Sequence, residues 1–336
     1  MHMKTKYIIT AALLQLCFIT SFAQQSNLNE DYSKYLPEVR NINNFLKKQP
    51  PAESILTKEG LEKSRNSMKG FINANTIVKP TIKNIQGPGG NIPLMIFKPD
   101  TVRAVVLDIH GGGWCVGTAA NDAQFNDELA RTCKVAVVSV DYRLAPESPF
   151  PACIEDCKAA AKWLLDNCKT EFGTDKIFIS GGSAGGHLAA VTTLYFRDSL
   201  HAIDKVKGVN LIYGVYDLGR TPSHRLATDS SFLSKKDMEE IMQLVFPGWT
   251  MEQKQDPHYS PLYADLHGLP PALFTVGAAD PLADDTYFME ARWRMAGNRT
   301  YLAVYPEAGH GVDILPTKMG KLAQAKMYQW INDLCK

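Results

Sequence analysis

The sequence lacks an excess of charge of either sign. Its 336 residues contain 36 Lys and Arg against 35 Asp and Glu, which gives a formal net charge of +1 at pH 7. Proteins that bind nucleic acids usually carry a strong positive field, so this balance argues against nucleic acid as a partner. With 45% hydrophobic and 21% charged residues, the composition excludes a disordered, collagen-like or coiled-coil chain.

Signatures of metals and other cofactors are also missing. The chain contains no Cys-x-x-Cys motif and no His-Glu-x-x-His motif, and its eight histidines lack the spacing of metal ligands. We therefore expect neither a metal nor another cofactor. Beyond residue 23 no segment is apolar enough to span a membrane, so we expect no integral membrane segment in the mature protein.

The first 23 residues are typical of a secretory signal peptide. Lys4 and Lys6 precede an apolar stretch over residues 7–22, which is shorter than the roughly 20 residues that a membrane-spanning helix needs. Ser21 and Ala23 form a small-x-small cleavage site. We predict cleavage after Ala23 and a periplasmic or secreted mature protein. Export makes disulfides possible among the six cysteines that follow, but the sequence does not choose their pairing.

Short apolar runs alternate with helical patterns along the rest of the chain. Eight runs are predicted strands: residues 81–85, 92–97, 104–109, 135–140, 177–179, 209–213, 272–276 and 301–304. Most of them are apolar throughout, which is typical of strands buried on both faces of a parallel sheet. Helical patterns lie between them, for example at 154–168 and 186–196. The alternation predicts a doubly wound α/β fold.

A G-x-S-x-G motif follows the predicted strand at 177–179 and precedes a helical pattern. Its serine, Ser183, lies between Gly181 and Gly185. In this context a sharp turn lifts the serine hydroxyl clear of the backbone, and the two glycines allow the strand and the helix to approach closely. Ser183 is therefore the predicted nucleophile.

Three consecutive glycines follow the predicted strand at 104–109, within the segment HGGGW at 110–114. Such a run is costly in conformational entropy, and it is typical of a loop whose backbone N–H groups turn toward a ligand. In lipases and esterases an HGGG loop contributes to the oxyanion hole together with the residue after the nucleophile. We predict an oxyanion hole formed by Gly112, Gly113 and Ala184. His110 is expected to support the loop rather than to act as a base.

An aspartate and a histidine follow later strands and complete a candidate catalytic triad. Asp280 comes first after a predicted strand, ahead of its competitors Asp284 and Asp285. His310, flanked by glycines, is the histidine that follows a strand after this acid. The order Ser183, Asp280, His310 is that of α/β-hydrolases and differs from the orders in chymotrypsin and subtilisin. We predict that Asp280 orients the imidazole and that His310 is the general base.

The motifs together resemble those of the α/β-hydrolase superfamily, in particular its hormone-sensitive-lipase-like branch, the bacterial family IV carboxylesterases. The resemblance covers about residues 75–335 and rests on these segments, in family order: HGGGW at 110–114, DYRLAPE at 141–147, FPA at 150–152, GGSAGG at 181–186, YSPL at 259–262, GAADPL at 277–282 and GHG at 309–311. One departure is Gly182, where many members have an aspartate before the serine. The change removes a hydrogen-bonding group and leaves the triad intact.

The resemblance implies a domain organisation. It implies an α/β-hydrolase fold of the fold-3 type, with a mostly parallel sheet of about eight strands flanked by helices and a helical cap. Residues 1–23 would be the signal peptide, residues 24–70 the N-terminal cap helices, and residues 71–336 the catalytic domain with a cap insertion at 218–263. An amphipathic pattern at 234–246 predicts a helix within this insertion.

The resemblance also implies an activity, that of a serine hydrolase acting on carboxylic ester bonds. The expected enzyme is a carboxylesterase or acetyl esterase whose partner is a small ester with a short acyl chain. The same triad could serve a deacetylase of acetylated sugars or another amide or carbamate hydrolase, and the fold could be a catalytically dead ligand-binding protein. Trp114 and Tyr213 are candidate substrate-binding residues, because their rings could narrow the pocket. The natural substrate and the oligomeric state stay open, a homodimer included.

Overall fold

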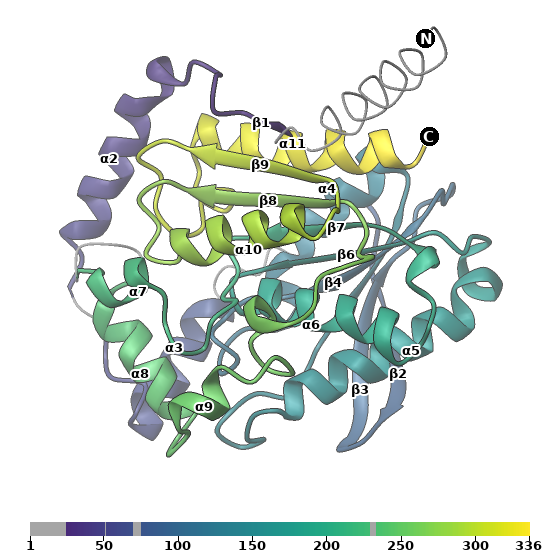
Figure 1. Ribbon diagram of the computed structural model, residues 1–336, viewed down its shortest axis with the longest axis horizontal. Coiled ribbons are helices and arrows are strands. Elements are labelled where there is room, and N and C mark those ends of the chain that lie inside the picture. Colours follow the sequence, from purple (N-terminus) through teal and green to yellow (C-terminus); the bar gives the residue numbers. More distant parts are fainter. Residues whose placement is uncertain (1–24, 51, 70–74, 229–232) are drawn as a thin grey trace, which may run out of the picture.

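A nine-stranded sheet forms the centre of the computed structural model, which describes residues 25–50, 52–69, 75–228 and 233–336 (Figure 1). The predicted signal peptide, residues 1–23, lies outside the described residues. The strands are β1 Gln25–Ser26, β2 Thr81–Gly87, β3 Gly90–Phe97, β4 Val105–Ile109, β5 Ala136–Val140, β6 Ile177–Gly182, β7 Val206–Ile212, β8 Ala272–Gly277 and β9 Thr300–Tyr305. Their order in the sheet is β1-β9-β8-β7-β6-β4-β5-β3-β2. Strand β3 is antiparallel to β2 and β5, and the other neighbours are parallel, which confirms the predicted mostly parallel sheet.

The sequence predicts eight of these strands and misses β1. This strand has only two residues and carries no hydrophobic pattern. It can therefore be recognised only by its pairing with β9 in the folded chain. Asn27 continues the pairing beyond it. The Asn27 N–H donates to the Leu302 carbonyl (3.2 Å), and its side-chain oxygen accepts from the Val304 N–H (2.7 Å). The start of the described chain therefore covers the outer edge of β9.

Helices cover both faces of the sheet. Helices α4 (Ala123–Cys133) and α11 (Lys318–Leu334) pack against each other on one face. Helices α5 (Ala152–Phe172), α6 (Ala184–Asp198) and α10 (Ala283–Met295) cover the other face (Figure 1). The helical patterns predicted at 154–168 and 186–196 correspond to α5 and α6. Three layers of this kind bury the central strands on both sides.

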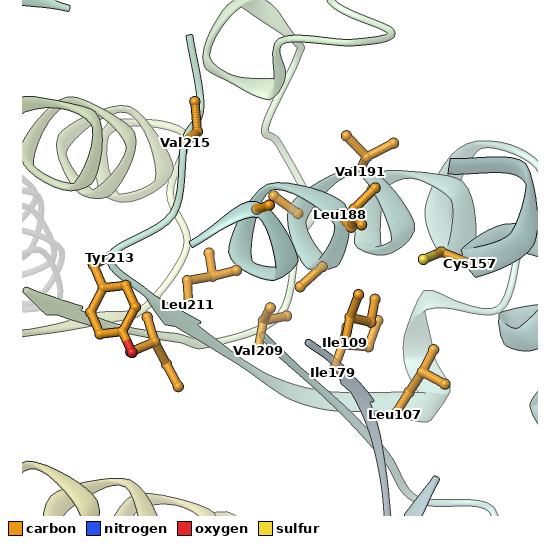
Figure 2. Close-up of a cluster of buried hydrophobic side chains, with 14 of the residues drawn as sticks. Leu107, Ile109, Cys157, Ile179, Leu188, Val191, Val209, Leu211, Tyr213 and Val215 are labelled. Atoms are coloured by element: carbon orange, nitrogen blue, oxygen red, sulfur yellow. The ribbon is translucent and has the colours of Figure 1, made fainter. Parts of the chain in front are cut away.

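The core between the sheet and α6 explains why the central strands are apolar at successive positions. Figure 2 shows the side chains that β4, β6, β7 and α6 contribute on this face: Leu107, Ile109, Ile179, Val209, Leu211, Leu188 and Val191. The intervening residues Val106 and Phe178 are buried on the opposite face, against α4 and α11. Each fully buried aliphatic side chain contributes about 1.5–3 kcal/mol to folding. The central strands therefore hold the loops at their ends on a rigid base.

Five further helices lie on the side toward which the arrows of β8 and β9 point (Figure 1). Helices α2 (Leu36–Lys47) and α3 (Lys58–Lys69) precede the sheet in sequence. Helices α7 (Pro222–Leu226), α8 (Lys235–Val245) and α9 (Met251–Lys254) belong to the long insertion between β7 and β8. The insertion therefore lies at the carboxyl ends of the parallel strands, where α/β sheets bind their ligands.

Helix α8 matches the helix predicted at 234–246 and begins with a capping box. The Ser234 hydroxyl accepts from the Asp237 N–H (3.0 Å), and the Asp237 carboxylate accepts from the Ser234 N–H (3.0 Å). The buried face of the helix consists of Met238, Met242 and Val245. This apolar face holds α8 against the rest of the protein.

Two hydrogen bonds join α8 to the segment between α2 and α3. The Ile55 N–H donates to the Glu240 carboxylate (3.0 Å), and the Lys236 ammonium donates to the Ala52 carbonyl (3.0 Å). Residues about 185 positions apart in sequence are thereby held together. The N-terminal helices and the insertion form one continuous layer over the carboxyl ends of the strands.

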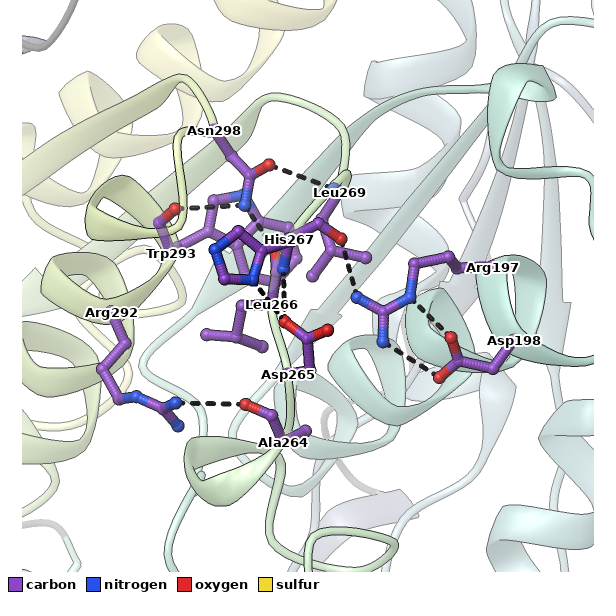
Figure 3. Close-up of polar contacts among 10 residues, drawn as sticks. All are labelled: Arg197, Asp198, Ala264, Asp265, Leu266, His267, Leu269, Arg292, Trp293 and Asn298. Atoms are coloured by element: carbon purple, nitrogen blue, oxygen red, sulfur yellow. Dashed lines mark hydrogen bonds and ion pairs between the residues drawn. The ribbon is translucent and has the colours of Figure 1, made fainter.

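Polar contacts fix the point where the insertion returns to the sheet (Figure 3). The Asn298 side chain accepts from the Leu269 N–H (3.0 Å) and donates to the Leu266 carbonyl (2.6 Å). Arg197 of α6 donates to the His267 carbonyl (2.8 Å). These bonds anchor the segment entering β8, the strand after which the predicted acid lies.

The six cysteines of the described residues are all free and buried: Cys115, Cys133, Cys153, Cys157, Cys168 and Cys335. Burial raises the pKa of the Cys115 and Cys153 thiols to about 12.

Within the described ranges, no helix combines the length and the apolar character needed to cross a membrane.

Candidate active site

The turn between β6 and α6 carries Ser183 in a strained conformation. Its φ is 57° and its ψ is −121°, values that residues with a side chain rarely adopt. Glycines on both sides make this turn possible. A Cβ atom at Gly185 would lie 1.9 Å from the Ile109 carbonyl oxygen, and one at Gly181 would lie 2.3 Å from the Gly185 oxygen. The turn that carries Ser183 therefore requires glycine at positions 181 and 185.

Ser183, His310 and Asp280 lie in hydrogen-bonding distance of one another. The His310 Nε2 atom is 3.0 Å from the Ser183 hydroxyl oxygen, and its Nδ1 atom is 2.9 Å from Asp280 Oδ2. The other oxygen of Asp280 accepts from the Leu282 N–H (2.8 Å). His310 and Asp280 are buried, with 7% and 3% of their surface exposed. The three predicted residues are thus brought together in the order that proton transfer from serine to histidine requires.

The two competing aspartates are engaged elsewhere. Asp284 accepts from the Ser223 N–H (2.7 Å). Asp285 accepts from the N–H groups of Tyr216 (2.7 Å) and Asp217 (2.9 Å), and burial raises its pKa to about 7. Neither carboxylate bonds to the triad histidine. The first aspartate after β8 is the one that contacts the imidazole, as the sequence predicts.

The glycine loop after β4 lies beside the serine. A Cβ atom at Gly111 would come within 3.5 Å of Ser183 Cβ, and the φ angles of Gly112 (+112°) and Gly113 (+55°) lie in the region that favours glycine. In the described part of the chain, the N–H groups of Gly112, Gly113 and Ala184 donate no hydrogen bond. They are therefore free to bind an oxygen atom at the serine.

His110 supports this loop from behind. Its Nδ1 atom lies 2.7 Å from the Gly111 carbonyl oxygen, and its ring stacks on Tyr142 at a centroid distance of 4.1 Å. The Tyr142 hydroxyl donates to the His110 carbonyl (2.8 Å). Burial lowers the pKa of His110 to about 4, so the ring is neutral at physiological pH. This arrangement agrees with the predicted supporting role.

Trp114 lies in a buried aromatic cluster rather than on an open surface. Only 2% of its surface is exposed, and its indole N–H donates to His187 Nδ1 (3.1 Å). Its ring contacts Phe150 and Phe246 at centroid distances of 6.4 and 5.4 Å. The indole therefore forms part of the wall behind the glycine loop.

Tyr213 and Asp313 form a second contact to the histidine that the motifs do not reveal. The Tyr213 ring meets the His310 ring edge-on at 4.6 Å, and its hydroxyl donates to Asp313 (2.6 Å). Burial raises the pKa of Asp313, and the hydrogen bond from Tyr213 acts against that shift. The pair therefore fixes one face of the imidazole. The two residues are 100 positions apart, and Asp313 belongs to no predicted motif.

Helix α2 supports the loop that carries His310. Arg40 binds the Glu307 carboxylate through two hydrogen bonds (2.6 and 2.5 Å), and the Asn43 side chain donates to the Glu307 carbonyl (2.9 Å). The φ of Glu307 is +57°, an unfavourable value for this residue type. The contacts from α2 hold this conformation three residues before the histidine.

Helix α3 supports the segment that follows the glycine loop. The Arg65 guanidinium donates to the carbonyls of Cys115 and Ala145, both at 2.9 Å, and pairs with the Glu147 carboxylate at 2.8 Å. Helix α2 thus brings Arg40 to the loop that carries His310, and α3 brings Arg65 to the segment after the glycine loop. No sequence signal points to these arginines, because both contacts bridge distant segments.

No group of three or more His, Cys, Asp or Glu side chains that could hold a metal ion occurs among the described residues. The chemistry that the site supports is that of a serine nucleophile, a histidine base, an orienting carboxylate and unengaged backbone donors.

Known proteins resemble this chain in sequence and in fold. Residues 106–314 match the family described as "alpha/beta hydrolase fold". The chain is 35% identical over 246 residues to the carboxylic ester hydrolase LipN of Mycobacterium tuberculosis, and the alignment covers 70% of this chain and 64% of LipN, slightly less than two thirds. It is 34% identical over 238 residues to the carboxylesterase NlhH of the same organism, covering 66% of this chain and 71% of NlhH.

A solved structure entitled "Pyrobaculum calidifontis esterase monoclinic form" superposes with a TM-score of 0.77 at 31% identity, covering 88% of this chain and 98% of that one. The chain therefore belongs to the α/β-hydrolase family. Within that family, its likeness to the hormone-sensitive-lipase-like carboxylesterases, which the motifs predict, is confirmed.

Proposed function

We propose that the protein is an exported serine carboxylesterase that hydrolyses small esters with short acyl chains. The observation that carries this proposal is the position of the His310 ring, 3.0 Å from the Ser183 hydroxyl and 2.9 Å from the Asp280 carboxylate. The names of the relatives LipN and NlhH, both ester hydrolases, support the same reaction.

The first half of the reaction uses the triad. His310 Nε2 accepts the hydroxyl proton as Ser183 Oγ attacks the ester carbonyl carbon. Asp280 accepts a hydrogen bond from Nδ1, which keeps the imidazole in the tautomer that can act as a base and stabilises the imidazolium once it forms. The imidazolium then returns the proton to the departing alcohol oxygen, and an acyl-serine remains.

The glycine loop stabilises the charge that develops on the carbonyl oxygen. The N–H groups of Gly112, Gly113 and Ala184 are the donors for this oxyanion, and one such donor is typically worth about 3 kcal/mol of transition-state stabilisation. Water, activated by the same histidine, then attacks the acyl-serine and releases the acid. Each step uses groups of this chain, water and the ester alone.

Residues 24–70 and the insertion at 218–263 form the proposed cap. Their helices lie over the carboxyl ends of the strands and are joined by the hydrogen bonds of Ile55 and Lys236. Helix α8 lies against the oxyanion loop. A Cβ atom added at Gly113 would lie only 2.9 Å from the Ile241 side chain. A side chain this close to the loop limits the space beside the reacting carbonyl, which favours short acyl groups.

Hydrolysis of a series of p-nitrophenyl esters from acetate to laurate, with acetylated saccharides alongside, tests the activity. We expect C2 to C6 esters to be cleaved faster than C12 esters. The Ser183→Ala variant should lose at least about 10³-fold in kcat. Its control is Ser199→Ala, at the exposed far end of α6, which should keep wild-type activity. Faster turnover of C12 esters contradicts the acyl preference, and preferential release of acetate from saccharides identifies a sugar deacetylase instead.

Export is tested on the protein recovered from its natural host. We expect the purified protein to begin at residue 24 and to be recovered outside the cytoplasm. A serine-directed organophosphonate should add mass to Ser183. A protein that keeps Met1 contradicts the processing, and mass added at another residue contradicts the nucleophile.

A further inference from the structure

A cavity in the insertion between β7 and β8 takes no part in the proposed reaction. It measures about 510 Å³ and opens between the end of α8 and α9, helices of the layer beside α3 in Figure 1. Its lining includes two cations, Arg220 and Lys254, and three large apolar residues, Met242, Phe246 and Trp249. Its volume is that of a small-molecule site, typically about 300–1,000 Å³.

Arg220 and Lys254 are half-buried cations without a partner. Within the described ranges, neither side chain makes a hydrogen bond or an ion pair. Burial and the charge of Arg220 lower the pKa of Lys254. The nearby carboxylate of Asp217 is occupied, because it accepts from the Gly219 N–H (2.6 Å) and the Tyr263 hydroxyl (3.1 Å). Two like charges that share a half-buried cavity repel each other unless an anion lies between them.

Arg220 lies in a strained turn. Its φ of +72° is unfavourable for a residue with a side chain, and its N–H donates to the Asp217 carbonyl (3.1 Å), which closes the turn. Strained residues of this kind concentrate at ligand sites. Four residues later, His224 is buried, and burial with the charges of Arg220 and Arg225 lowers its pKa to about 4. Arg220 is thus an unpaired cation at a strained position, in a region where burial and the charges of two arginines disfavour a further positive charge.

Aromatic residues are also part of the cavity lining. The Trp249 ring contacts those of Phe246 and Tyr259 at centroid distances of 5.4 and 5.1 Å, which fixes its orientation. We propose that this cavity binds an aromatic carboxylate, with the carboxylate between Arg220 and Lys254 and the ring against Trp249. Arginine suits this task because its planar guanidinium can bind both oxygens of a carboxylate.

This site is separate from the proposed catalytic one. Phe246 and Trp114, each 2% exposed, are in ring contact at 5.4 Å and lie between the cavity and the glycine loop. The bound carboxylate is therefore not the ester under attack. The two sites share α8, since Ile241 of this helix lies against Gly113.

Titration calorimetry of the full mature protein with benzoate tests the proposal. We expect saturable binding with a Kd on the order of 1 mM or tighter. Arg220→Gln and Lys254→Gln should each weaken binding at least about tenfold, because each removes a charged hydrogen-bond donor. The control Lys235→Gln removes an exposed cation from the same insertion and should bind benzoate as wild type does. Benzamide, the neutral analogue, and acetate, which lacks the ring, should both bind at least about tenfold more weakly than benzoate.

A second titration uses protein whose Ser183 carries an organophosphonate, so that the catalytic pocket is blocked. We expect unchanged benzoate affinity. Loss of binding in the blocked protein, equal affinity for benzamide, or wild-type affinity in both charge variants would each overturn the proposal. The thermal midpoints of the variants, compared with that of Lys235→Gln, show whether a weakened affinity reflects unfolding. If Ser183 is not labelled, the proposed reaction is wrong, while the charge variants still decide the binding site.

Discussion

Asp280→Asn should inactivate the enzyme by reversing one hydrogen bond. Asp280 Oδ1 accepts from the Leu282 N–H at 2.8 Å, and Oδ2 faces His310 Nδ1 at 2.9 Å. In the variant, the amide oxygen must stay at the Leu282 N–H, so the amide NH₂ faces Nδ1. An NH₂ group can only donate to that nitrogen, which moves the imidazole proton to Nε2. The nitrogen beside Ser183 then carries a proton and cannot accept another.

The expected loss follows from this tautomer. In the serine-protease triad the same change lowers kcat by about 10⁴-fold, and we expect a comparable loss here, equivalent to about 5 kcal/mol of transition-state stabilisation. KM should change little, because Asp280 is 3% exposed and lies behind the histidine, away from the substrate. Steady-state hydrolysis of p-nitrophenyl acetate separates kcat from KM. Urea unfolding of the same protein shows whether the fold is retained.

Asp284→Asn provides the matched control, because its carboxylate accepts from the Ser223 N–H, away from the imidazole. It should keep kcat within about threefold of wild type. If Asp280→Asn keeps more than a tenth of wild-type kcat, or if Asp284→Asn is the inactive variant, the reasoning from the Leu282 hydrogen bond is refuted.

Three further outcomes follow from buried groups. Tyr213→Phe removes the 2.6 Å bond to the buried Asp313 and should lower the free energy of unfolding by about 1–3 kcal/mol, with kcat reduced more than KM is raised; an unchanged unfolding curve contradicts this. Burial raises the pKa of Asp285 from 3.8 to about 7, so the native protein keeps a proton that the unfolded chain releases, and the free energy of unfolding should fall as pH rises from 4 to 7. Asp285→Asn should flatten that dependence, and an equally steep slope in the variant would show that other groups cause it. Because burial raises the pKa of the Cys115 and Cys153 thiols to about 12, Ellman's reagent at pH 8 should leave the native thiols largely unmodified and react with them in 6 M guanidinium.

Features that depend on residues adjacent in sequence could be predicted from the sequence. Most of the eight longer strands are apolar runs, and Ser183 lies in a motif whose glycines are required by close contacts. Asp280 and His310 follow strand ends, so a parallel sheet brings both to the same edge as the serine. The two-residue strand β1 and the contact between Tyr213 and Asp313 depend on partners far away in sequence. Local pattern carries no information about such partners, so only the folded chain reveals them.

The first described residues decide what the edge of the sheet presents to other molecules. With β1 and Asn27 in place, the Leu302 carbonyl and the Val304 N–H are paired within the chain. A chain shortened past Asn27 would leave β9 as an open edge strand, whose free backbone groups are a template for pairing with a neighbouring molecule. The predicted cleavage after Ala23 spares β1. Cleavage at that point would thus remove the leader and keep both β1 and Asn27, which cover the edge of β9.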